Sequence, residues 1–374
     1  MSGTARICVV TGSRAEFGLL RPIMQAIKSH PALELQVVAC GSHLLQSGLT
    51  LRDVKKQFDL SGVVPMQVDG RRTRADDAEA VGVGVARFAR LFAALAPHCV
   101  LVLGDRIEAF AAASAAAVSG IALAHVHGGD RAEGIADEAM RHAITKLANV
   151  HFPATEGSGA RIVRMSEAPA SVHVVGSPAI DDLASFEPLS KDEHESLGAP
   201  QIVVLFHPVG RSDGQEASAM ETLLGSMASE RFVVLAPNAD PGCNGILEAA
   251  QRRDVRLEHH MPRARFLGLL RRIAADSGGL LIGNSSCALI EAAAIPLRVI
   301  DIGDRQRGRE RGQNVVHCDE DAGSISSAMQ RARALHLSRP DHPYGDGRAG
   351  LRIASILAGM DLATAHSPRK IAEY

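Results

Sequence analysis

The sequence predicts an α/β protein made of two doubly wound domains, each built around a parallel sheet. Short runs rich in β-branched residues alternate with longer segments of helical periodicity, which is the pattern of parallel strands joined by crossover helices. With 374 residues the chain is too long for one average domain, so two are expected. The alternation breaks at residues 176–181 and a polar stretch follows at 187–200, so we place the boundary near residues 178–200.

Each predicted strand is a short apolar run, and the helices fit between these runs. In the first half the strands are expected at residues 6–10, 34–39, 62–66, 100–103, 121–125, 150–152 and 172–175, with helices such as 17–30, 76–95 and 137–147. In the second half the strands are expected at 202–206, 232–235, 255–257, 280–282 and 298–300. The alanine-rich run near residue 112 is explained by helix propensity. Residues 347–360 are expected as a helix, for which packing back on the first domain is one arrangement.

Composition narrows the class of protein. Lys and Arg total 40 against 42 Asp and Glu, so no whole-molecule field favours nucleic acid or a membrane surface. The six cysteines contain no CxxC pair, which favours buried free thiols in a reducing compartment over disulfides or zinc. The longest apolar run, 109–124, is shorter than the roughly 20 residues of a membrane span. The amino terminus enters a strand pattern almost at once, so no signal peptide is expected and we predict a cytoplasmic protein.

Ligands of open α/β sheets bind at the carboxyl ends of the strands, and four segments fall there. The first follows the first predicted strand, where Gly12 permits a tight turn and Arg14 can pair with a phosphate. An ordinary strand-to-helix turn with a solvated arginine remains an equal alternative. A dinucleotide fingerprint is absent, because the loop lacks the pattern GxGxxG.

The second and third segments supply ionisable groups. Asp105 follows the fourth strand, although a helix N-cap is the alternative for an aspartate there. His125 and His127 suggest a metal, but no third ligand is spaced to complete a site, so we expect none. Asp130 follows two glycines, and a further carboxylate pair comes one loop later, formed by Asp137 and Glu138. Carboxylates gathered in a cleft repel one another, which raises a pKa toward the working pH.

The fourth segment lies in the second half of the chain. There His207 follows a strand, and Gly283, Ser285 and Ser286 join another strand to a helix. Such a turn can bind an anion or phosphate, and its alternative is a simple N-capped helix. An arginine-rich loop follows that includes Arg309. A solvated charge run is the usual explanation for such a loop, and a nearby phosphate site would favour binding.

Together these residues give the chain a strong resemblance to the UDP-N-acetylglucosamine 2-epimerase family, specifically its hydrolysing branch. The matching motifs are TGSRAEFGLLRP, LVLGDRIEAF, HVHGGDRAEGIADEAMRHAITKLANVHF, VVGSPAID, the His207 segment, GNSSCALIEAA and IGDRQRGR. They cover roughly residues 6–315. The resemblance implies two Rossmann-like domains of the GT-B type, a sugar nucleotide in the cleft between them, and chemistry without a metal or redox cofactor.

The resemblance also implies roles for individual residues. The catalytic set is Asp105, Asp130, Asp137, Glu138 and His207; the substrate-binding set is Arg14, Arg106, His127, Gly283, Ser285, Ser286, Glu291 and Arg309. Residues 1–180 would carry the acid–base carboxylates, 181–350 would bind the nucleotide, and 351–374 would form a tail. Two departures matter. Many hydrolysing members have Glu at Asp130, and the non-hydrolysing branch has Glu at His127, so His127 favours hydrolysis.

The implied reaction converts UDP-N-acetylglucosamine and water into N-acetylmannosamine and UDP, by elimination to a 2-acetamidoglucal and hydration. The motifs do not distinguish this sugar from a UDP- or GDP-linked 2,4-diacetamido-2,4,6-trideoxyglucose (diacetylbacillosamine) of legionaminic-acid synthesis. A GT-B glycosyltransferase and a catalytically silent sugar-nucleotide-binding regulator are alternatives of other classes. The expected partner is the sugar-nucleotide substrate, with no nucleic acid and no membrane, and the expected assembly is a homodimer or homotetramer.

Overall fold

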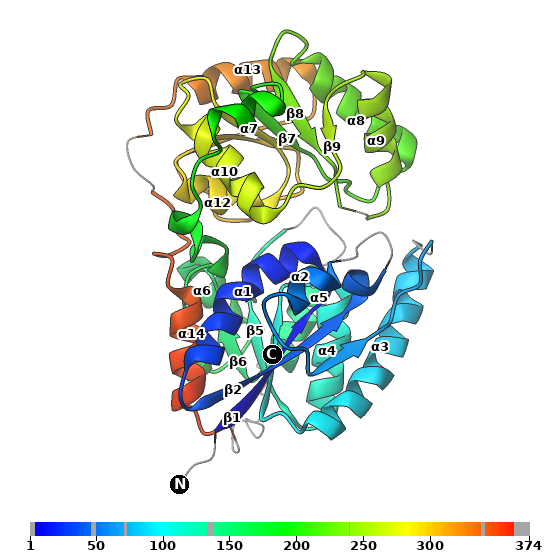
Figure 1. Ribbon diagram of the computed structural model, residues 1–374, viewed down its shortest axis with the longest axis vertical. Coiled ribbons are helices and arrows are strands. Elements are labelled where there is room, and N and C mark those ends of the chain that lie inside the picture. The colour runs from blue at the N-terminus through cyan, green and yellow to red at the C-terminus, as the bar shows by residue number, and fades with distance from the viewer. Residues whose placement is uncertain are drawn as a thin grey trace. The chain divides into compact units, whose positions relative to one another are not determined.

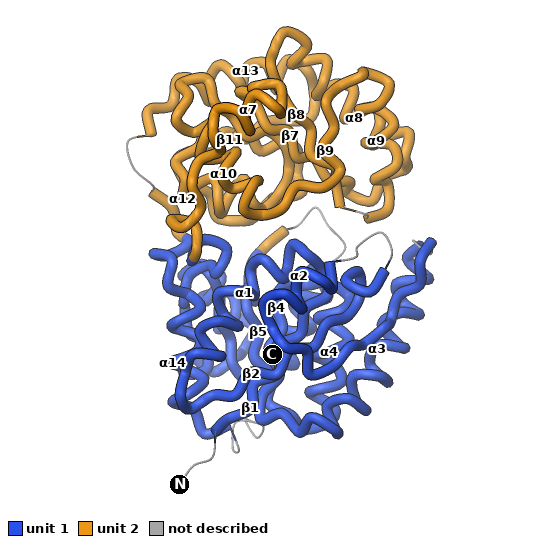
Figure 2. The backbone as a smooth tube through the Cα atoms, viewed as in Figure 1, with its two compact units in different colours: residues 1–130, 137–181, 344–374 blue, residues 131–136, 182–343 orange. Residues whose placement is uncertain are grey.

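The computed structural model describes residues 4–45, 50–70, 73–132, 138–238, 240–337 and 341–362. The chain forms two compact units (Figure 2). The first contains residues 1–130, 137–181 and 344–374, and the second contains residues 131–136 and 182–343. Each unit holds one sheet with helices on both faces (Figure 1).

The first unit is built on a six-stranded parallel sheet. Its strands are β1 (Ala5–Thr11), β2 (Leu33–Cys40), β3 (Gly62–Val64), β4 (Cys99–Leu103), β5 (Ala122–Val126) and β6 (Val150–Phe152), in the order β3-β2-β1-β4-β5-β6. The predicted strand at 172–175 is wrong: Val172 forms only an isolated bridge with His151. The chain leaves β6 after that bridge and turns into the 3₁₀ helix η3 (Pro178–Ile180).

Helices cover both faces of this sheet. They are α1 (Arg14–Ser29), η1 (Gly41–Leu44), α2 (Leu51–Lys55), α3 (Arg74–Leu95), α4 (Ile107–Val118), α5 (Glu138–Leu147), α6 (Glu156–Arg164), η2 (Pro169–Ser171) and α14 (Ala349–Gly359). Successive residues of a strand point to opposite faces. Accordingly Ile7 and Val9 pack with α1 and α14, whereas Cys8 and Val10 pack with α3 and α4.

The C-terminal helix α14 is an integral layer of the first unit. It lies along α1 (Figure 1), where the absence of a side chain at Gly350 allows close approach to the backbone of Pro22. The carboxylate of Asp181 accepts hydrogen bonds from the backbone N–H groups of Ala349 (2.9 Å) and Gly350 (2.6 Å). Segments 168 residues apart in the chain are therefore joined at the amino end of α14.

The second unit repeats the same topology. Its strands are β7 (Ile202–Leu205), β8 (Phe232–Leu235), β9 (Leu257–Glu258), β10 (Leu280–Gly283), β11 (Arg298–Ile302) and β12 (Val315–Cys318), in the order β12-β11-β10-β7-β8-β9. Its helices are η4 (Leu183–Ser185), α7 (Lys191–Ser196), α8 (Asp213–Gly225), α9 (Cys243–Arg252), α10 (Arg263–Ala274), α11 (Ser286–Leu289), α12 (Glu291–Ala294) and α13 (Ala322–Arg333).

The strand order reverses once in each sheet, between β1 and β4 in the first unit and between β7 and β10 in the second. Ligands of doubly wound sheets bind in the crevice at such a switch point, outside the carboxyl ends of the strands. The predicted fold class, two doubly wound α/β domains, is confirmed. Within the described ranges, no helix combines the length and the apolar character needed to span a membrane.

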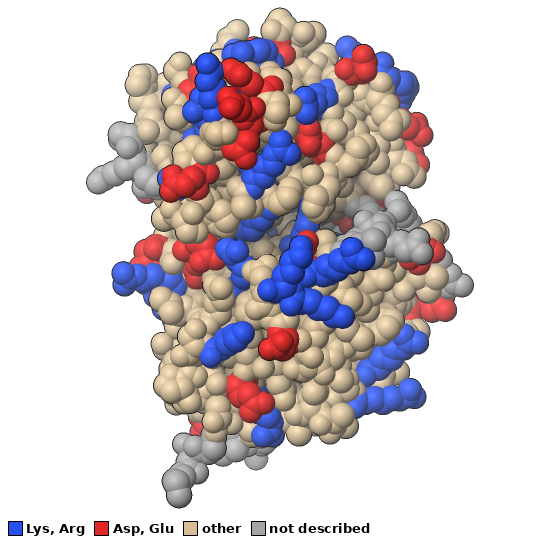
Figure 3. Space-filling model, viewed as in Figure 1, with Lys and Arg blue, Asp and Glu red and all other residues tan. Residues whose placement is uncertain are grey.

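Surface charge is mixed, in keeping with the small net charge of the sequence. On the face shown in Figure 3, basic side chains gather over α2, where Arg52, Lys55 and Lys56 are exposed. Acidic and basic groups alternate over the rest of that face (Figure 3).

Candidate active site

The loop after β4 holds the first predicted carboxylate. The N-cap residue of helix α4 is Arg106, and no side chain caps the helix, so Asp105 is not the capping residue that the alternative proposed. Asp105 forms an ion pair with Arg141 of α5 instead. Its side chain is 17% exposed, whereas that of Arg141 is only 3% exposed. The carboxylate of Asp105 is thus partly open at the carboxyl edge of the sheet.

Arg141 joins three predicted features of the site. Besides Asp105, its guanidinium donates to the carboxylate of Glu138 (2.5 Å) and to the backbone carbonyl of Asp130 (3.1 Å). Mutual repulsion of the carboxylates, expected from the sequence, is therefore offset by a buried positive charge. Arg141 was not predicted as a site residue, although its position three residues after Glu138 on a helix is a recognisable ion-pair spacing. Asp137 lies outside the described residues.

Asp130 is almost completely buried and hydrogen-bonded through both oxygens. One oxygen lies 2.8 Å from Nδ1 of His127, and the other accepts from the hydroxyl of Ser158 at 2.8 Å. His127 has a backbone φ of 62°, in the left-handed region, which is uncommon for a residue other than glycine. This conformation at the end of β5 accompanies the contact between its ring and the carboxylate three residues later.

His125 contacts different partners from His127, so the two rings do not share a site. Its Nε2 lies 2.8 Å from the carbonyl oxygen of Gly104, and its Nδ1 lies 3.1 Å from the hydroxyl of Thr145. Burial lowers the pKa of His125 to about 3, so the ring is neutral at pH 7. Because a carbonyl can only accept, Nε2 carries the proton. The Thr145 hydroxyl donates to the backbone carbonyl of Arg141 at 3.0 Å and lies beside the unprotonated Nδ1.

Two buried glutamates that the sequence analysis did not single out lie beside β1. Glu108 is fully buried and accepts from Nε of Arg106 at 3.3 Å, so the predicted binding residue Arg106 is partly engaged within the protein. Glu16 accepts from the backbone N–H of Gly12 at 2.6 Å, and burial raises its pKa to about 8. A Cβ at Gly12 would lie 2.7 Å from the Glu108 side chain, so glycine is needed there. Arg14, the first residue of α1, is exposed.

In the second unit, Asn284 joins the ends of β7 and β10. Its side chain accepts from the N–H of His207 (2.7 Å) and donates to the carbonyl of the same residue (2.8 Å). Nδ1 of His207 accepts from the backbone N–H of Asn238 at 3.1 Å. Burial and nearby Arg305 hold the pKa of His207 well below its ordinary value, so the ring is neutral and its proton is on Nε2. His207 is therefore a hydrogen-bond donor at neutral pH.

The turn after β10 is tightly built. Gly283 has a φ of 149°, and a Cβ there would overlap the carbonyl of Leu205 on β7. Ser285 precedes α11 and is buried, but its hydroxyl does not cap that helix, so the simple capping alternative for this serine does not hold. Ser286 is half-buried as the first residue of α11. Buried Glu291 pairs with Arg263 at 2.9 Å.

The arginine-rich loop is attached to this turn. Arg305 and Gln306 both donate to the backbone carbonyl of Asn284, at 3.1 and 2.9 Å. Arg311 forms an ion pair with buried Asp301 of β11 at 2.6 Å. Arg309 is half-buried in the same loop. The loop is thus a fixed part of the carboxyl edge and differs from a solvated charge run.

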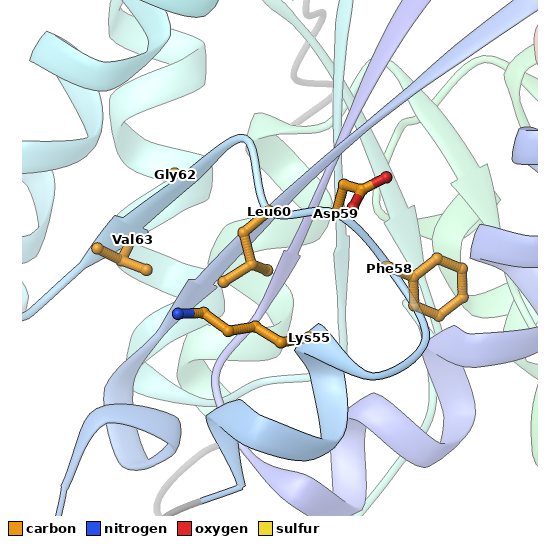
Figure 4. Close-up of a pocket in the computed structure, with 6 residues that line it drawn as sticks. All are labelled: Lys55, Phe58, Asp59, Leu60, Gly62 and Val63. Carbon is orange, nitrogen blue, oxygen red and sulfur yellow. The ribbon is translucent and has the colours of Figure 1, made fainter.

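A surface depression elsewhere on the first unit does not coincide with these residues. It is lined by Lys55, Phe58, Asp59, Leu60, Gly62 and Val63, between α2 and β3 (Figure 4). These residues lead into the amino end of β3, the opposite edge from the strand ends that hold Asp105 and Asp130. Among the described residues no cluster of three potential metal ligands occurs.

Comparison with known proteins assigns the family. A family model described as UDP-N-acetylglucosamine 2-epimerase matches residues 25–358. The chain belongs to the UDP-N-acetylglucosamine 2-epimerase family. The family resemblance expected from the motifs is therefore confirmed.

Two relatives of this epimerase-family chain are similar to it along nearly their whole length. The UDP-N,N'-diacetylbacillosamine 2-epimerase (hydrolyzing) of Legionella pneumophila is 32% identical over 96% of both chains. The UDP-N-acetylglucosamine 2-epimerase of Neisseria meningitidis serogroup B is 30% identical over 91% of both. A crystal structure of UDP-GlcNAc 2-epimerase from Neisseria meningitidis bound to UDP-GlcNAc matches with a TM-score of 0.77 at 17% identity, covering 94% of this chain and 99% of that one. This last similarity supports the fold.

Proposed function

We propose that this epimerase-family protein is a hydrolysing sugar-nucleotide 2-epimerase that converts UDP-N-acetylglucosamine and water into N-acetylmannosamine and UDP. The observation that carries the proposal is the buried acid–base cluster at the carboxyl edge of the first sheet. There Arg141 gathers Asp105 and Glu138, and His127 orients Asp130. A plain phosphate-binding site would need no such set of carboxylates.

The chemistry assigned to the first unit is removal and delivery of a proton at C2 of the sugar. In the elimination, a carboxylate takes the C2 proton, the C2–H electrons form the C1=C2 double bond, and the C1–O bond breaks to release UDP. Water then adds its oxygen to C1, and a proton is delivered to the opposite face of C2. We assign these steps to Asp105, Asp130 and Asp137, with Glu138 beside them. Asp105 is the more accessible of the two described aspartates.

The second unit is assigned to the nucleotide. His207 presents a neutral Nε2–H, which suits a hydrogen bond to the departing phosphate better than proton transfer from an imidazolium. We assign Gly283, Ser285, Ser286 and Arg309 to the diphosphate, and Glu291 to the ribose hydroxyls. Arg14 and Arg106 complete the proposed contacts from the first unit, whereas His127, whose ring nitrogens contact Asp130 and Ser177, acts through Asp130. Holding both parts of the substrate would bring the sugar to the acid–base groups.

A second substrate has a specific observation in its favour. The 32% identical relative of Legionella pneumophila is named for UDP-N,N'-diacetylbacillosamine. The same elimination and hydration would apply to that sugar, because the reacting C1 and C2 carry the same groups.

We also propose that the enzyme acts in the cytoplasm as a homodimer or homotetramer. Cell fractionation tests the location, and light scattering tests the assembly.

One assay with parallel substrates separates these alternatives. The purified protein is incubated with UDP-N-acetylglucosamine or with UDP-N,N'-diacetylbacillosamine, and the products are analysed by NMR in D₂O. Release of UDP with a free 2-epimeric sugar that carries deuterium at C2 supports the proposal and identifies the substrate. Release of sugar with its original C2 configuration and no deuterium would show a plain hydrolase. Turnover only after addition of an acceptor would show a glycosyltransferase.

A further inference from the structure

Three buried side chains of the first unit form a hydrogen-bonded chain that extends the contact between His127 and Asp130 to a further residue. Nδ1 of His127 lies 2.8 Å from a carboxylate oxygen of Asp130, and Nε2 lies 3.0 Å from the hydroxyl of Ser177. The exposed fractions are 1% for Asp130, 6% for His127 and 0% for Ser177. His127 and Ser177 are 50 residues apart in the sequence.

The direction of each hydrogen bond follows from the chemistry of the partners. A carboxylate can only accept, so the proton between His127 and Asp130 belongs to Nδ1. Nε2 of a neutral imidazole is then an acceptor, and the hydroxyl of Ser177 must donate to it. That hydroxyl already accepts from the backbone N–H of Ala179 at 3.2 Å, which leaves its proton for His127. The chain therefore runs from Ser177 through His127 to Asp130.

Hydrogen bonds of its backbone and side chain fix the position of Ser177. Its backbone N–H donates to the carbonyl of Tyr344 at 2.8 Å, and its side chain caps η3. The preceding Gly176 has a φ of 89° and lies against the same Tyr344 carbonyl, where a Cβ would be only 2.9 Å away. The hydroxyl of Ser177 is thus positioned by two segments that are far apart in the chain.

We propose that Ser177 is a positioning residue that holds the His127 ring with its Nδ1–H directed at Asp130. This inference rests on the proposed function, in which Asp130 acts as an acid or base. Without the Ser177 hydroxyl, Nε2 would lose its donor and the ring would no longer be held in this orientation. Asp130 would then lose the fixed Nδ1–H that orients its carboxylate.

The test combines imidazole NMR with kinetics on the full-length protein. In wild type, ¹⁵N-edited spectra of the His127 ring, assigned with His127→Gln, should show the Nδ1–H tautomer. In Ser177→Ala we expect the Nδ1–H tautomer to be no longer the only form of the ring. We also expect kcat to fall by about 10-fold, a part of what a general acid–base group contributes, while KM changes little.

Matched variants test whether the effect comes from the hydroxyl group of Ser177. Ser177→Thr keeps a hydroxyl and should restore the wild-type tautomer. Ser171→Ala removes a hydroxyl that donates only to the Ala168 carbonyl, and should leave spectra and kcat unchanged. If Ser177→Ala does not fold, Ser177→Cys, with similar volume and a weaker donor, takes its place.

Two results would overturn the inference. One is an Nε2–H tautomer of His127 in the wild type, and the other is a Ser177→Ala protein with unchanged tautomer and kcat. The tautomer is measured without substrate. A wild-type protein that turns over neither sugar would therefore overturn the proposed function separately, through the kinetic arm alone.

Discussion

At the scale of single residues, Arg141 decides how the carboxylates of the first unit coexist. Its guanidinium is almost completely buried and contacts Asp105, Glu138 and the backbone at Asp130. A lysine could not reproduce these contacts, because its ammonium group lacks the planar fork of donors. Removing one partner of a buried ion pair leaves the other charge uncompensated, which typically costs about 3–5 kcal/mol.

We therefore expect Arg141→Met to lower both stability and activity. Asp105 is partly exposed, so its repulsion with Glu138 is screened by water and the loss should be nearer about 2 kcal/mol. Urea unfolding and the UDP-release assay measure the two effects. Arg164→Met, which changes an exposed arginine on α6, is the control and should be neutral. A wild-type rate and stability for Arg141→Met would contradict the role given to Arg141.

A second residue-scale prediction concerns the proposed acid–base groups. Asp105→Asn, Asp130→Asn and Asp137→Asn should each reduce turnover by at least about 10²-fold, the lower end for a general acid or base. UDP binding, measured by calorimetry, should persist in all three, because the nucleotide contacts are assigned to the second unit and to Arg14. Arg14→Ala should weaken UDP binding instead. Near-normal rates for the aspartate variants would mean that the cluster is structural.

At the scale of elements, the packing of α3 on α4 depends on a glycine within a helix. A Cβ at Gly84 would lie 2.9 Å from the Cβ of Ala111 and 3.1 Å from the side chain of Met66. At Gly82, on the same helix, an added Cβ would have no neighbour within 4 Å. The two glycines therefore differ in their surroundings while sharing the same helical backbone.

These surroundings predict opposite effects for the same substitution. Gly82→Ala should raise the free energy of unfolding by about 0.5–1 kcal/mol, because alanine reduces the conformational freedom of the unfolded chain. Gly84→Ala should lower it by about 1–3 kcal/mol, because the added methyl group overpacks the α3–α4 contact. Urea unfolding of both variants is the measurement. Equal effects of the two substitutions would show that α4 can move away from α3 without cost.

At the scale of the whole molecule, buried ionisable groups make stability depend on pH in two directions. Burial raises the pKa of Glu16 to about 8, so the unfolded chain releases a proton that the folded chain keeps. This contribution to stability is present at low pH and is lost as pH rises toward 8. Burial lowers the pKa of His43 to about 4 and of His125 to about 3. Their contribution is present above pH 6.5 and is lost as pH falls below it.

Glu16→Gln should remove the loss of stability on the alkaline side. From about pH 5 to about pH 8, the stability of the variant relative to wild type should increase by up to about 1.4 kcal/mol per pH unit. Urea unfolding across this range is the measurement. Glu34→Gln, at an exposed position on β2, is the control and should keep the wild-type slope. A parallel pH dependence for Glu16→Gln and wild type would show that Glu16 is ionised when folded.

The sequence by itself determined the fold class and the edge of each sheet at which the site residues lie. Periodicities of two and about 3.6 residues distinguish strands from helices, and the ends of apolar runs identify Asp105, Asp130, His207 and Gly283. These signals are local, because they depend on residues within one or two turns. The prediction of a strand at 172–175 was wrong, because β-branched composition does not specify whether a neighbouring strand is available to form the hydrogen bonds of a sheet.

Only the tertiary structure decided which side chains meet. The contact of Asp105 with Arg141 spans 36 residues, and that of His127 with Ser177 spans 50. The burial of Glu108 beneath Gly12 and Gly41 joins three different strand ends. No periodic pattern records such pairs, because each depends on how crossover helices return the chain to the sheet. The protonation states of Glu16, His125 and His207 follow from that burial, so they too are properties of the folded protein.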